Sequence, residues 1–274
     1  MQMGKSEEGI SVVIPTLNCV THLAELLKSI PTTQEVFGVE VLVVDSNSED
    51  GTDSLAESLG ARILSAPRSR SVARNVGAQH ATFDRLAFFD CDMLLSPLLL
   101  PYCFAGLTEF DALCIREVTL GGNYWSRARS LERDACFGTT IFESARCFRR
   151  DVFHQLGGYD PDIDGLEDPD LQARLVRRGF TVGWVEQPVF HDEKGVGLAE
   201  YLGKRRVYSY SDRLFRKRHA ALADKLSSPS ARFRLVLKTM KASGLRNTVH
   251  LIPGWAFIRA SEFLVRRVTG YGIP

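Results

Sequence analysis

The sequence predicts an α/β protein built on an open, mostly parallel sheet, and three observations lead to this prediction. Short apolar runs recur through the first half of the 274 residues. Between them lie segments whose apolar residues recur at the spacing of an amphipathic helix. Two of the apolar runs end on aspartate. Strands that alternate with helices in this way need right-handed crossovers, which place the strands parallel in one sheet.

The first expected strand is ISVVIP at 10–15, a continuous apolar run that is typical of a buried parallel strand. Leucine and isoleucine at helical spacing then predict a helix over 23–30. Further elements are expected as strands at 39–45, 62–65 and 86–90, and as helices at 53–59 and 71–81. Because ligands gather at the carboxyl ends of the strands in such sheets, the polar residues after each strand are the candidates for function.

The pattern becomes mixed after about residue 110. The expected elements there are strands at 111–118, 140–148 and 181–190 and a helix at 169–178. From residue 197 the sequence is helical and basic, with turn breaks expected at 227–230 and 252–254. We therefore predict a domain over 8–196, divided into halves at 8–110 and 111–196, and a basic amphipathic helical extension over 197–274.

The formal net charge of +1 hides an uneven distribution of charge along the chain. Residues 194–274 hold 17 Lys and Arg against four Asp and Glu, a net +13, whereas residues 1–193 carry a net −12. This asymmetry indicates an anionic partner for the basic part. A composition of 45% apolar and 24% charged residues excludes a disordered or collagen-like chain.

Cysteine usage and the absence of long apolar stretches indicate a protein that is neither exported nor membrane-spanning. The six cysteines form no C-x-x-C pair or zinc-like cluster, so we expect reduced thiols in an intracellular protein. The start, MQMGKSEEGISVVIP, carries charges where a signal peptide needs an apolar stretch. The most apolar segment, 86–107, contains Asp90, Asp92 and two prolines, so we expect no transmembrane helix.

Asp90-Cys91-Asp92 directly follows the apolar run LAFF. Two carboxylates that flank one residue at a strand end can offer oxygens to a hard divalent cation, which usually shares them with phosphates. The D-x-D pattern occurs four times in this chain, so the position at a strand end is what distinguishes this one. The alternative is a pair of solvated acids in a turn.

Asp45 and Arg74 are candidates for contacts with a nucleotide. Asp45 ends an expected strand, where an acid can accept hydrogen bonds from a base or ribose that lies across the sheet edge. The polar residues at 46–52 also suit helix capping, which we prefer for most of them. Arg74 lies on the helix before the D-x-D strand, and a guanidinium there can pair with phosphate. An exposed helix arginine is the alternative.

A second acidic centre, Glu167-Asp168-Pro169-Asp170, opens the helix expected at 169–178. Acids at a helix N-terminus are expected for capping alone, but a carboxylate in a cleft can act as a general base. His191 closes the last expected strand. Neutral imidazole is a common metal ligand, so we expect His191 to contact a metal or a phosphate, with a structural role as the alternative.

In this order, the motifs resemble the family 2 glycosyltransferases of the GT-A fold, a Rossmann-like, mostly parallel sheet flanked by helices. The resemblance covers about 10 to 215. Its motifs are ISVVIPTLN, VVDSNSEDGT, SVARNVGAQHA followed by LAFFDCD, and FRRDVFHQLGGYDPDIDGLEDPDLQARLVRRG. The second motif has Ser46 where the family usually has another acid. The resemblance implies that 8–196 is a GT-A catalytic domain, with a nucleotide-binding half at 8–110 and an acceptor half at 111–196.

The resemblance also implies a role for each candidate residue. The residues that would bind the nucleotide sugar are Pro15, Thr16, Asn18, Asp45, Arg74, Asp90 and Cys91. Among these, Asp45 would contact the base, Arg74 the diphosphate and Asp90 the ribose and base. Asp92 and His191 would bind Mg²⁺ or Mn²⁺, and Asp168, with Glu167 beside it, would be the catalytic base. The implied reaction is inverting transfer from a nucleotide-sugar donor to a hydroxyl acceptor, lipid-linked or glycan.

The processive members of the family carry Q-x-x-R-W after the base, and this chain has no such motif, which favours addition of a single sugar. The basic extension interleaves Arg and Lys with aromatic and aliphatic residues, a pattern typical of helices that lie on an anionic membrane surface. We therefore expect a cytoplasmic protein that is peripheral to the inner face of the cell membrane, and no nucleic-acid partner. The alternative for the extension is packing on the domain.

Two other functions are compatible with parts of the sequence. A D-x-D after an apolar strand also occurs in aspartyl-phosphate phosphatases, where the first Asp is the nucleophile. Met93, Leu94 and Leu95 follow here instead of the threonine that such a site needs, which makes this function unfavourable. The other alternative is a non-catalytic sugar-nucleotide-binding protein of the same fold, against which the joint presence of the candidate acids speaks.

Overall fold

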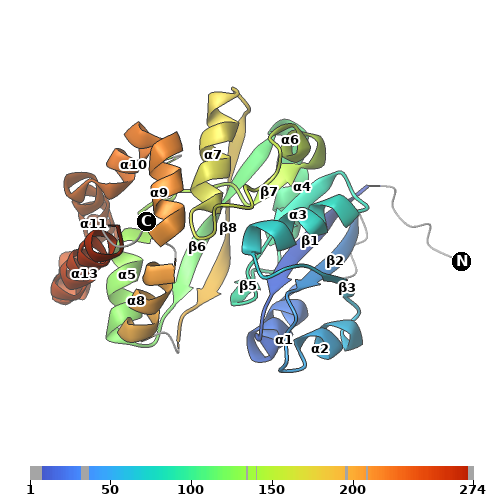
Figure 1. Ribbon diagram of the computed structural model, residues 1–274, viewed down its shortest axis with the longest axis horizontal. Helices are drawn as coiled ribbons and strands as arrows, with labels where there is room; N and C mark the ends of the chain where they lie inside the picture. The colour runs from blue at the N-terminus through green and yellow to red at the C-terminus, as the bar shows by residue number, and fades with distance from the viewer. Residues whose placement is uncertain are drawn as a thin grey trace, which may run out of the picture. The chain divides into compact units, whose positions relative to one another are not determined.

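The computed structural model describes residues 8–31, 37–133, 135–139, 141–194, 197–207 and 209–270 (Figure 1). Residue 140 of the strand predicted at 140–148 lies outside this set. So do residues 32–36, 134, 195–196, 208 and 271–274 of the predicted domains. The chain divides into two compact units, which do not follow the order of the sequence. Unit 1 comprises 1–116, 144–161 and 171–190, and unit 2 comprises 117–143, 162–170 and 191–274.

The strands that the structure describes form one eight-stranded sheet in the order β3-β2-β1-β4-β7-β6-β8-β5. Their bounds are β1 Gly9–Thr16, β2 Gly38–Asp45, β3 Arg62–Ser65, β4 Arg85–Phe88, β5 Met93–Leu95, β6 Ala112–Leu120, β7 Cys147–Arg149 and β8 Val182–Asp192. The pairs β3-β2, β2-β1 and β1-β4 are parallel, whereas β7 runs antiparallel to β4 and β6. The fold is therefore α/β with a mostly parallel sheet, as the sequence predicts.

Helices cover both faces of the sheet in unit 1. They are α1 Val20–Ser29, α2 Thr52–Ser58, α3 Arg70–His80, α4 Leu99–Glu109, α6 Arg150–Gln155 and α7 Glu167–Arg177, which belongs to unit 1 from Leu171 onward. Successive residues of a strand point to opposite faces, so Val12 and Ile14 of β1 join a core with α1, α2 and α4. Val13 lies between them in the chain and joins a second core with α3, α6 and α7. A strand that is buried on both faces is nearly continuous in apolar residues. This is why the apolar run ISVVIP predicts a strand.

Helix α3 approaches the sheet closely because it has a glycine where it crosses β1 (Figure 1). A Cβ atom added at Gly77 would lie 2.3 Å from Cγ1 of Val13. Val13 is completely buried and β-branched, so its side chain has few other rotamers to adopt. This contact fixes the distance between α3 and the strand that leads to Thr16.

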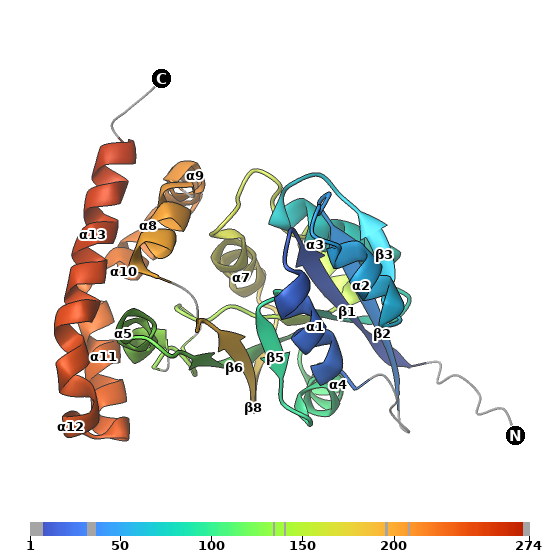
Figure 2. The ribbon, with the colours of Figure 1, turned by 90° about the horizontal axis from the view of Figure 1, so that it is seen from below.

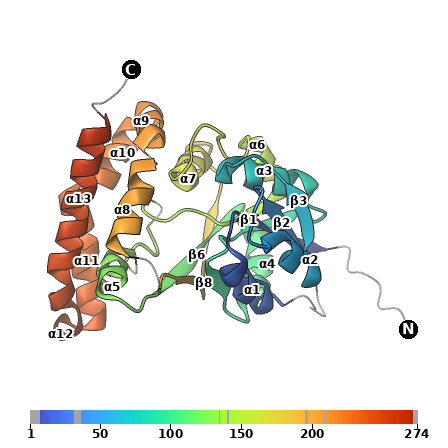
Figure 3. The same ribbon diagram turned by 60° about the horizontal axis from the view of Figure 1, so that its bottom comes forward.

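Unit 2 is mostly helical (Figure 2). Its helices are α5 Tyr124–Arg133, α8 Leu198–Val207, α9 Ser209–Arg218, α10 Ala220–Ser227, α11 Pro229–Ser243, α12 Leu245–Thr248 and α13 Ile252–Gly270, with a 3₁₀ turn, η1, at Val249–Leu251. Helices α11 and α13 both pack on α5, as Figure 3 shows. Their shared apolar core includes Leu131, Val236, Trp255 and Ile258. None of the described helices is both long enough and apolar enough to cross a bilayer.

The buried carboxylate of Glu132 joins three helices of unit 2. Glu132 lies on α5, accepts a hydrogen bond from Nε1 of Trp255 at 3.0 Å and lies 3.1 Å from Nε of Arg259, both on α13. Arg232 of α11 donates to its other oxygen. A buried carboxylate is costly unless it is paired in this way, so Glu132 selects the arrangement in which all three helices meet.

Several of the predicted elements differ from the structure. Of the strand expected at 140–148, the described residues form a strand only from Cys147, and α4, α5 and α6 are helices that the sequence prediction lacks. The break expected at 252–254 is the start of α13, and the interruption lies in η1. Pro101 and Pro253 explain two of these errors. Each lies in the first turn of a helix, where proline is tolerated because its missing N–H has no intrahelical acceptor.

We expect Gly77→Ala to lower stability by about 1–3 kcal/mol, because the new methyl group overpacks the contact with Val13. Gly203→Ala is the matched control, since Gly203 also lies in a helix but a Cβ there meets no atom within 4 Å. The control should raise stability by roughly 0.5–1 kcal/mol through helix propensity. Urea denaturation followed by circular dichroism measures both changes. Stabilisation by Gly77→Ala would contradict the close packing of α3 on β1.

Candidate active site

The carboxyl ends of β1 and β2 bring Thr16 and Asp45 together at one edge of the sheet, where the parallel register places them opposite each other. Oδ1 of Asp45 accepts hydrogen bonds from Oγ1 of Thr16 at 2.9 Å and from Oγ of Ser48 at 2.6 Å. Oδ2 accepts from the backbone N–H of Ser48 at 2.8 Å. Three donors therefore hold this buried carboxylate in one orientation at the strand end.

Asn18 links the turn after β1 to the turn after β2. Its φ of 49° is in the left-handed region, which asparagine tolerates better than most residues. Its backbone N–H donates to Oγ of Ser48 at 2.8 Å, and its side-chain oxygen accepts from the backbone N–H of Glu49 at 2.8 Å. Pro15, before it, is half-buried, whereas Asn18 is exposed. The structure thus joins the predicted residues Pro15, Thr16, Asn18 and Asp45 into one edge.

Arg74 is completely buried and forms an ion pair with Asp90, with 2.7 Å between Nη2 and Oδ1. The second oxygen of Asp90 lies 3.7 Å from Nη1 of Arg146. The guanidinium of Arg74 also lies 5.0 Å from the centre of the Tyr159 ring. The structure therefore brings Arg74 and Asp90 together, and it balances the charge of Arg74 within unit 1.

The loop at 157–161 is tied to α3 by the side chain of Asn75. Its Nδ2 donates to the backbone oxygen of Tyr159 at 2.7 Å, and its Oδ1 accepts from the backbone N–H of Tyr159 at 2.9 Å. Gly158 has a φ of 68°, and a Cβ atom there would lie 2.6 Å from Oδ1 of Asn75. Only glycine fits this position, so Gly158 allows the loop to approach α3 closely.

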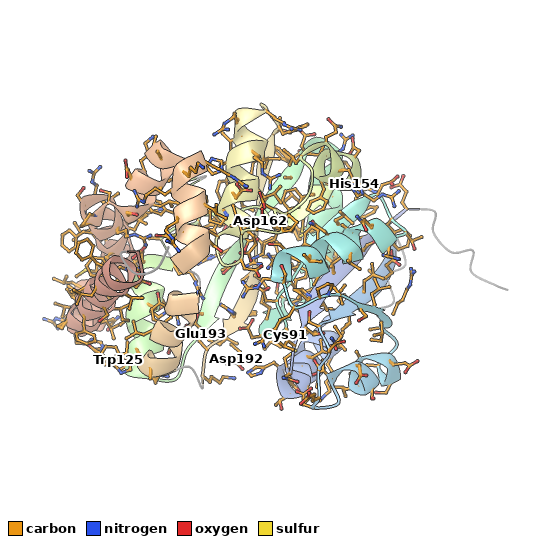
Figure 4. All side chains as sticks on the ribbon, viewed as in Figure 1. Cys91, Trp125, His154, Asp162, Asp192 and Glu193 are labelled. Carbon is orange, nitrogen blue, oxygen red and sulfur yellow. The ribbon has the colours of Figure 1, made fainter. Side chains whose placement is uncertain are left out.

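Cys91 and Asp92 follow Asp90 in the turn before β5, and both are half-buried. Figure 4 labels Cys91. The Cys91 thiol shares a hydrogen bond with the thiol of Cys19, which together with burial raises the pKa of Cys91 far above its usual value. The same hydrogen bond lowers the pKa of Cys19. Cys91 is therefore a neutral thiol at physiological pH, packed against the start of α1.

Within the part of the chain that the structure describes, no three His, Cys, Asp or Glu side chains gather to hold a metal ion. A hard divalent cation such as Mg²⁺ does not require three protein ligands. It usually keeps several waters and is bound through one or two carboxylates together with substrate phosphates. A half-buried carboxylate such as that of Asp92 fits this type of site.

In the acidic centre of unit 2, three carboxylates occupy the first turn of α7 and have different surroundings. Glu167 is buried and accepts a hydrogen bond from the backbone N–H of Gly165. Asp170 is buried and lies 2.8 Å from Nε2 of His219 on the loop before α10. Asp168 differs from both because it is only half-buried.

His191, near the end of β8, lies in a cluster of charged side chains. Its Nδ1 lies 2.8 Å from Nη1 of Arg133, which also donates to Oε1 of Glu193 at 3.0 Å. Arg129 donates to the same oxygen of Glu193 at 3.0 Å. Glu193 is 2% exposed, so its charge is balanced by two arginines of α5. Figure 4 labels Glu193 and its neighbour Asp192.

The comparison with protein families identifies the chain. The family model described as Glycosyl transferase family 2 matches residues 11–158, which include the edge formed by Thr16, Asp45 and Asp90. The chain belongs to glycosyltransferase family 2. It is a glycosyltransferase, and its sheet with flanking helices is the GT-A fold.

Curated relatives carry the same activity class. The pre-mycofactocin glycosyltransferase of Mycobacterium tuberculosis is 24% identical over 79% of this chain and 49% of its own length. The O-antigen chain rhamnosyltransferase RfbN of Salmonella typhimurium is 24% identical over 66% of this chain and 65% of its own length. The chain spans less than two thirds of the length of these relatives. A mannosyltransferase of Pyrobaculum calidifontis, solved with GDP-Man and Mn²⁺, has a TM-score of 0.68 at 16% identity, covering 98% of this chain and 90% of its own.

Sequence reasoning missed several residues that position the candidates. They are Arg146 and Tyr159 around Arg74 and Asp90, His219 beside Asp170, and Arg129 and Arg133 near His191. The contacts of the α5 arginines could not be predicted, because the sequence analysis places no helix at that position. For Tyr159, the preceding Gly157-Gly158 pair was a usable signal, since a glycine pair indicates a close approach of two backbones.

We expect Asp90→Ala to destabilise the protein by about 3–5 kcal/mol, because it removes the carboxylate that forms a 2.7 Å ion pair with the buried guanidinium of Arg74. Asp84→Ala is the matched control. Asp84 also forms an ion pair with an arginine, Arg150, at 2.7 Å, but its side chain is 84% exposed. That pair should contribute at most about 1 kcal/mol. Urea denaturation compares the two variants, and equal losses would show that burial of the Arg74 pair does not matter.

Proposed function

We propose that this glycosyltransferase moves one sugar from a nucleotide-sugar donor to a hydroxyl acceptor with inversion at the anomeric carbon. The observation that carries this proposal is the edge at which Thr16, Asp45 and Asp90 follow three adjacent parallel strands, inside the region that the family model matches. Ligands bind at such edges because the backbone and side-chain polar groups of several strands end there. The absence of Q-x-x-R-W supports transfer of a single sugar.

The donor binds along the edge in this proposal. Pro15, Thr16 and Asn18 line the nucleotide, and Asp45 accepts hydrogen bonds from N–H groups of the base. Asp45 suits this role because its three hydrogen bonds hold the carboxylate in place before the donor arrives. Asp90 lies beside the ribose, and the neutral thiol of Cys91 packs next to it. The buried Arg74 supports the diphosphate site indirectly, because its ion pair holds the carboxylate of Asp90 in place.

The divalent metal fits the carboxylate of Asp92, together with oxygens of the donor's diphosphate. The metal supplies a positive charge that stabilises the charge developing on the leaving nucleoside diphosphate. Support comes from related structures. The mannosyltransferase of Pyrobaculum calidifontis was solved with Mn²⁺, and so was the glucosyl-3-phosphoglycerate synthase of Mycobacterium tuberculosis, which has a TM-score of 0.55 at 20% identity and covers 77% of this chain and 82% of its own. Mn²⁺ or Mg²⁺ is the proposed cofactor.

Asp168 removes the proton of the acceptor hydroxyl as it attacks the anomeric carbon, and Glu167 holds the loop. Glu167 and Asp170 are buried against Gly165 and His219, so their carboxylates serve the structure of the helix start. Asp168 is half-buried, which leaves part of its carboxylate accessible to an acceptor. A carboxylate accepting a proton in the transition state contributes about 10²–10⁴-fold to the rate.

We expect Asp168→Asn to lower the rate of sugar transfer by at least 10²-fold while nucleoside diphosphate binding stays unchanged. The assay is release of nucleoside diphosphate from a panel of nucleotide sugars with Mn²⁺, with and without alcohol and glycan acceptors. Asp162→Asn is the control, because Asp162 is an exposed acid of the same loop (Figure 4). Full activity of Asp168→Asn would refute its role as the base, and binding without turnover in the wild type would favour a non-catalytic protein.

The acceptor in this proposal is lipid-linked or a glycan, and the enzyme lies on the inner face of the cell membrane. Large apolar side chains are exposed on helices α11 to α13, among them Phe233, Leu245, Phe257, Phe263 and Leu264. Exposed basic side chains alternate with them at Arg234, Lys241 and Arg246. Apolar side chains next to basic ones suit an anionic lipid surface, because the apolar groups are removed from water and the basic groups are attracted to the lipid headgroups.

Replacing two of these apolar side chains should detach the protein from vesicles. We expect Phe263→Glu combined with Leu264→Glu to weaken binding to phosphatidylglycerol vesicles at least tenfold, because two exposed apolar groups become charged. Leu98→Glu is the control, since Leu98 is 57% exposed but lies before α4 in unit 1. Flotation on a density gradient measures the bound fraction. Unchanged flotation of the double variant would contradict membrane binding by α13.

A further inference from the structure

One face of α9 packs toward the acidic segment at 162–170, which carries Asp168. Ser211, Phe215 and His219 follow one another at intervals of four residues, so they lie on one side of α9 and of the residue directly after it. All three are buried, whereas the residues between them are half-buried or exposed. The buried side of α9 is therefore the side that holds these three residues.

Two hydrogen bonds join this side of α9 to the acidic segment, one on each side of Asp168. Oγ of Ser211 accepts from the backbone N–H of Asp164 at 3.0 Å. Nε2 of His219 lies 2.8 Å from Oδ1 of Asp170. A carboxylate has only acceptor atoms, so the imidazole donates this hydrogen bond. The chain is thus restrained both shortly before and shortly after Asp168, and all these residues belong to unit 2.

Asp170 can transmit the position of the imidazole to Asp168, because both lie in the first turn of α7. The backbone N–H of Asp170 donates to the backbone oxygen of Leu166 at 3.1 Å, which closes this turn. Glu167 restrains the turn further, since its carboxylate accepts a hydrogen bond from the backbone N–H of Gly165. Distances between Cα atoms are fixed within a closed helical turn, so a shift of Asp170 also moves Asp168.

Burial makes the contact between Asp170 and His219 a strong restraint. Their side chains are 1% and 3% exposed. A carboxylate at this depth that loses a hydrogen-bond donor is destabilised by about 1–3 kcal/mol or more, which favours a shift of the turn toward water. The imidazole is itself held in place. Its ring centre lies 5.0 Å from that of Phe215, and the backbone of His219 bonds to Phe215 and Ala223, each at 2.8 Å.

We propose that His219 is a positioning residue for sugar transfer, which acts through Asp170 to hold the carboxylate of Asp168 where it meets the acceptor hydroxyl. This inference rests on the proposed function, in which Asp168 is the base. A displacement of a reacting group by about 1 Å can cost about 10²-fold in rate. The basic extension therefore takes part in the reaction through residues 209–219, besides its proposed role at the membrane.

Two substitutions separate the hydrogen bond of His219 from its volume. Leucine has no donor, whereas glutamine places an N–H group near the position of Nε2. We expect His219→Leu to lower kcat about tenfold or more, while the KM of the nucleotide sugar and the Kd of GDP or UDP with Mn²⁺ stay within about threefold. His219→Gln should keep kcat within about threefold of the wild type. The assay uses the nucleotide sugar and acceptor that the wild type turns over fastest.

Val236→Ala is the control for a general loss of stability. Val236 is buried in the core that α5 shares with α11 and α13, so the substitution leaves a cavity in unit 2 outside the acidic segment. We expect it to lower the free energy of unfolding but to keep kcat within about twofold at a temperature where all variants are folded. A loss of kcat in Val236→Ala as large as that in His219→Leu would contradict a specific role of His219.

Combination with Asp168→Asn shows whether His219 acts through the base. If it does, His219→Leu lowers the kcat of the wild type but leaves the residual kcat of Asp168→Asn unchanged, because two residues that act as a unit are not additive. The same fold loss in both backgrounds would overturn the proposal, and so would equal losses in His219→Leu and His219→Gln.

Failure of the proposed function has a different signature. Full activity of Asp168→Asn, or no turnover by the wild type, would overturn the proposed function whatever the His219 variants do. Amide hydrogen exchange tests the restraint itself without any substrate. We expect residues 162–170 to exchange faster in His219→Leu than in the wild type, His219→Gln or Val236→Ala. Unchanged exchange in His219→Leu would show that the imidazole does not hold this segment and would overturn the inference alone.

Discussion

The buried ion pair between Arg74 and Asp90 is the constraint on which the arrangement of unit 1 depends. A guanidinium with no exposed surface requires a counterion within the protein, and Asp90 forms an ion pair with it at 2.7 Å. This requirement joins α3 to the end of β4 and fixes the turn that carries Cys91 and Asp92. Through the ring of Tyr159 it also reaches the loop at 157–161. Asp90, the first acid of the D-x-D motif, therefore stabilises the fold and also lies at the sheet edge that we propose binds the donor.

The parallel half of the sheet was predictable because its strands are buried on both faces. β1, β2 and β4 are mostly apolar, and a polar residue lies at or just after the carboxyl end of each. The same runs place Thr16, Asp45 and Asp90 at one edge, so the positions of these candidates could be read from the sequence. α4 was missed because Pro101 resembles a helix breaker, although it lies in the first turn of the helix.

The partners of the candidate residues were not predictable, because ion pairs join residues that are distant in the sequence. Arg146 lies 56 positions after Asp90, and Arg133 lies 58 positions before His191. The chain has many arginines, and the tertiary structure brings these two next to Asp90 and His191. The sequence therefore identifies which residue types lie at a strand end, but not the ion pairs and hydrogen bonds that surround them.

The three-helix connection at Glu132 has a consequence for the order in which the protein folds. Domains generally fold as units during synthesis, N-terminal parts first, and every segment of unit 1 has been synthesised by residue 190. α5 is made early, but its partners Trp255 and Arg259 follow more than 120 residues later. Until α13 has been synthesised, the apolar side chains of α5 that pack against it lack that contact. Unit 2 is thus completed last, and α5 is the segment that a chaperone would protect while the chain is growing.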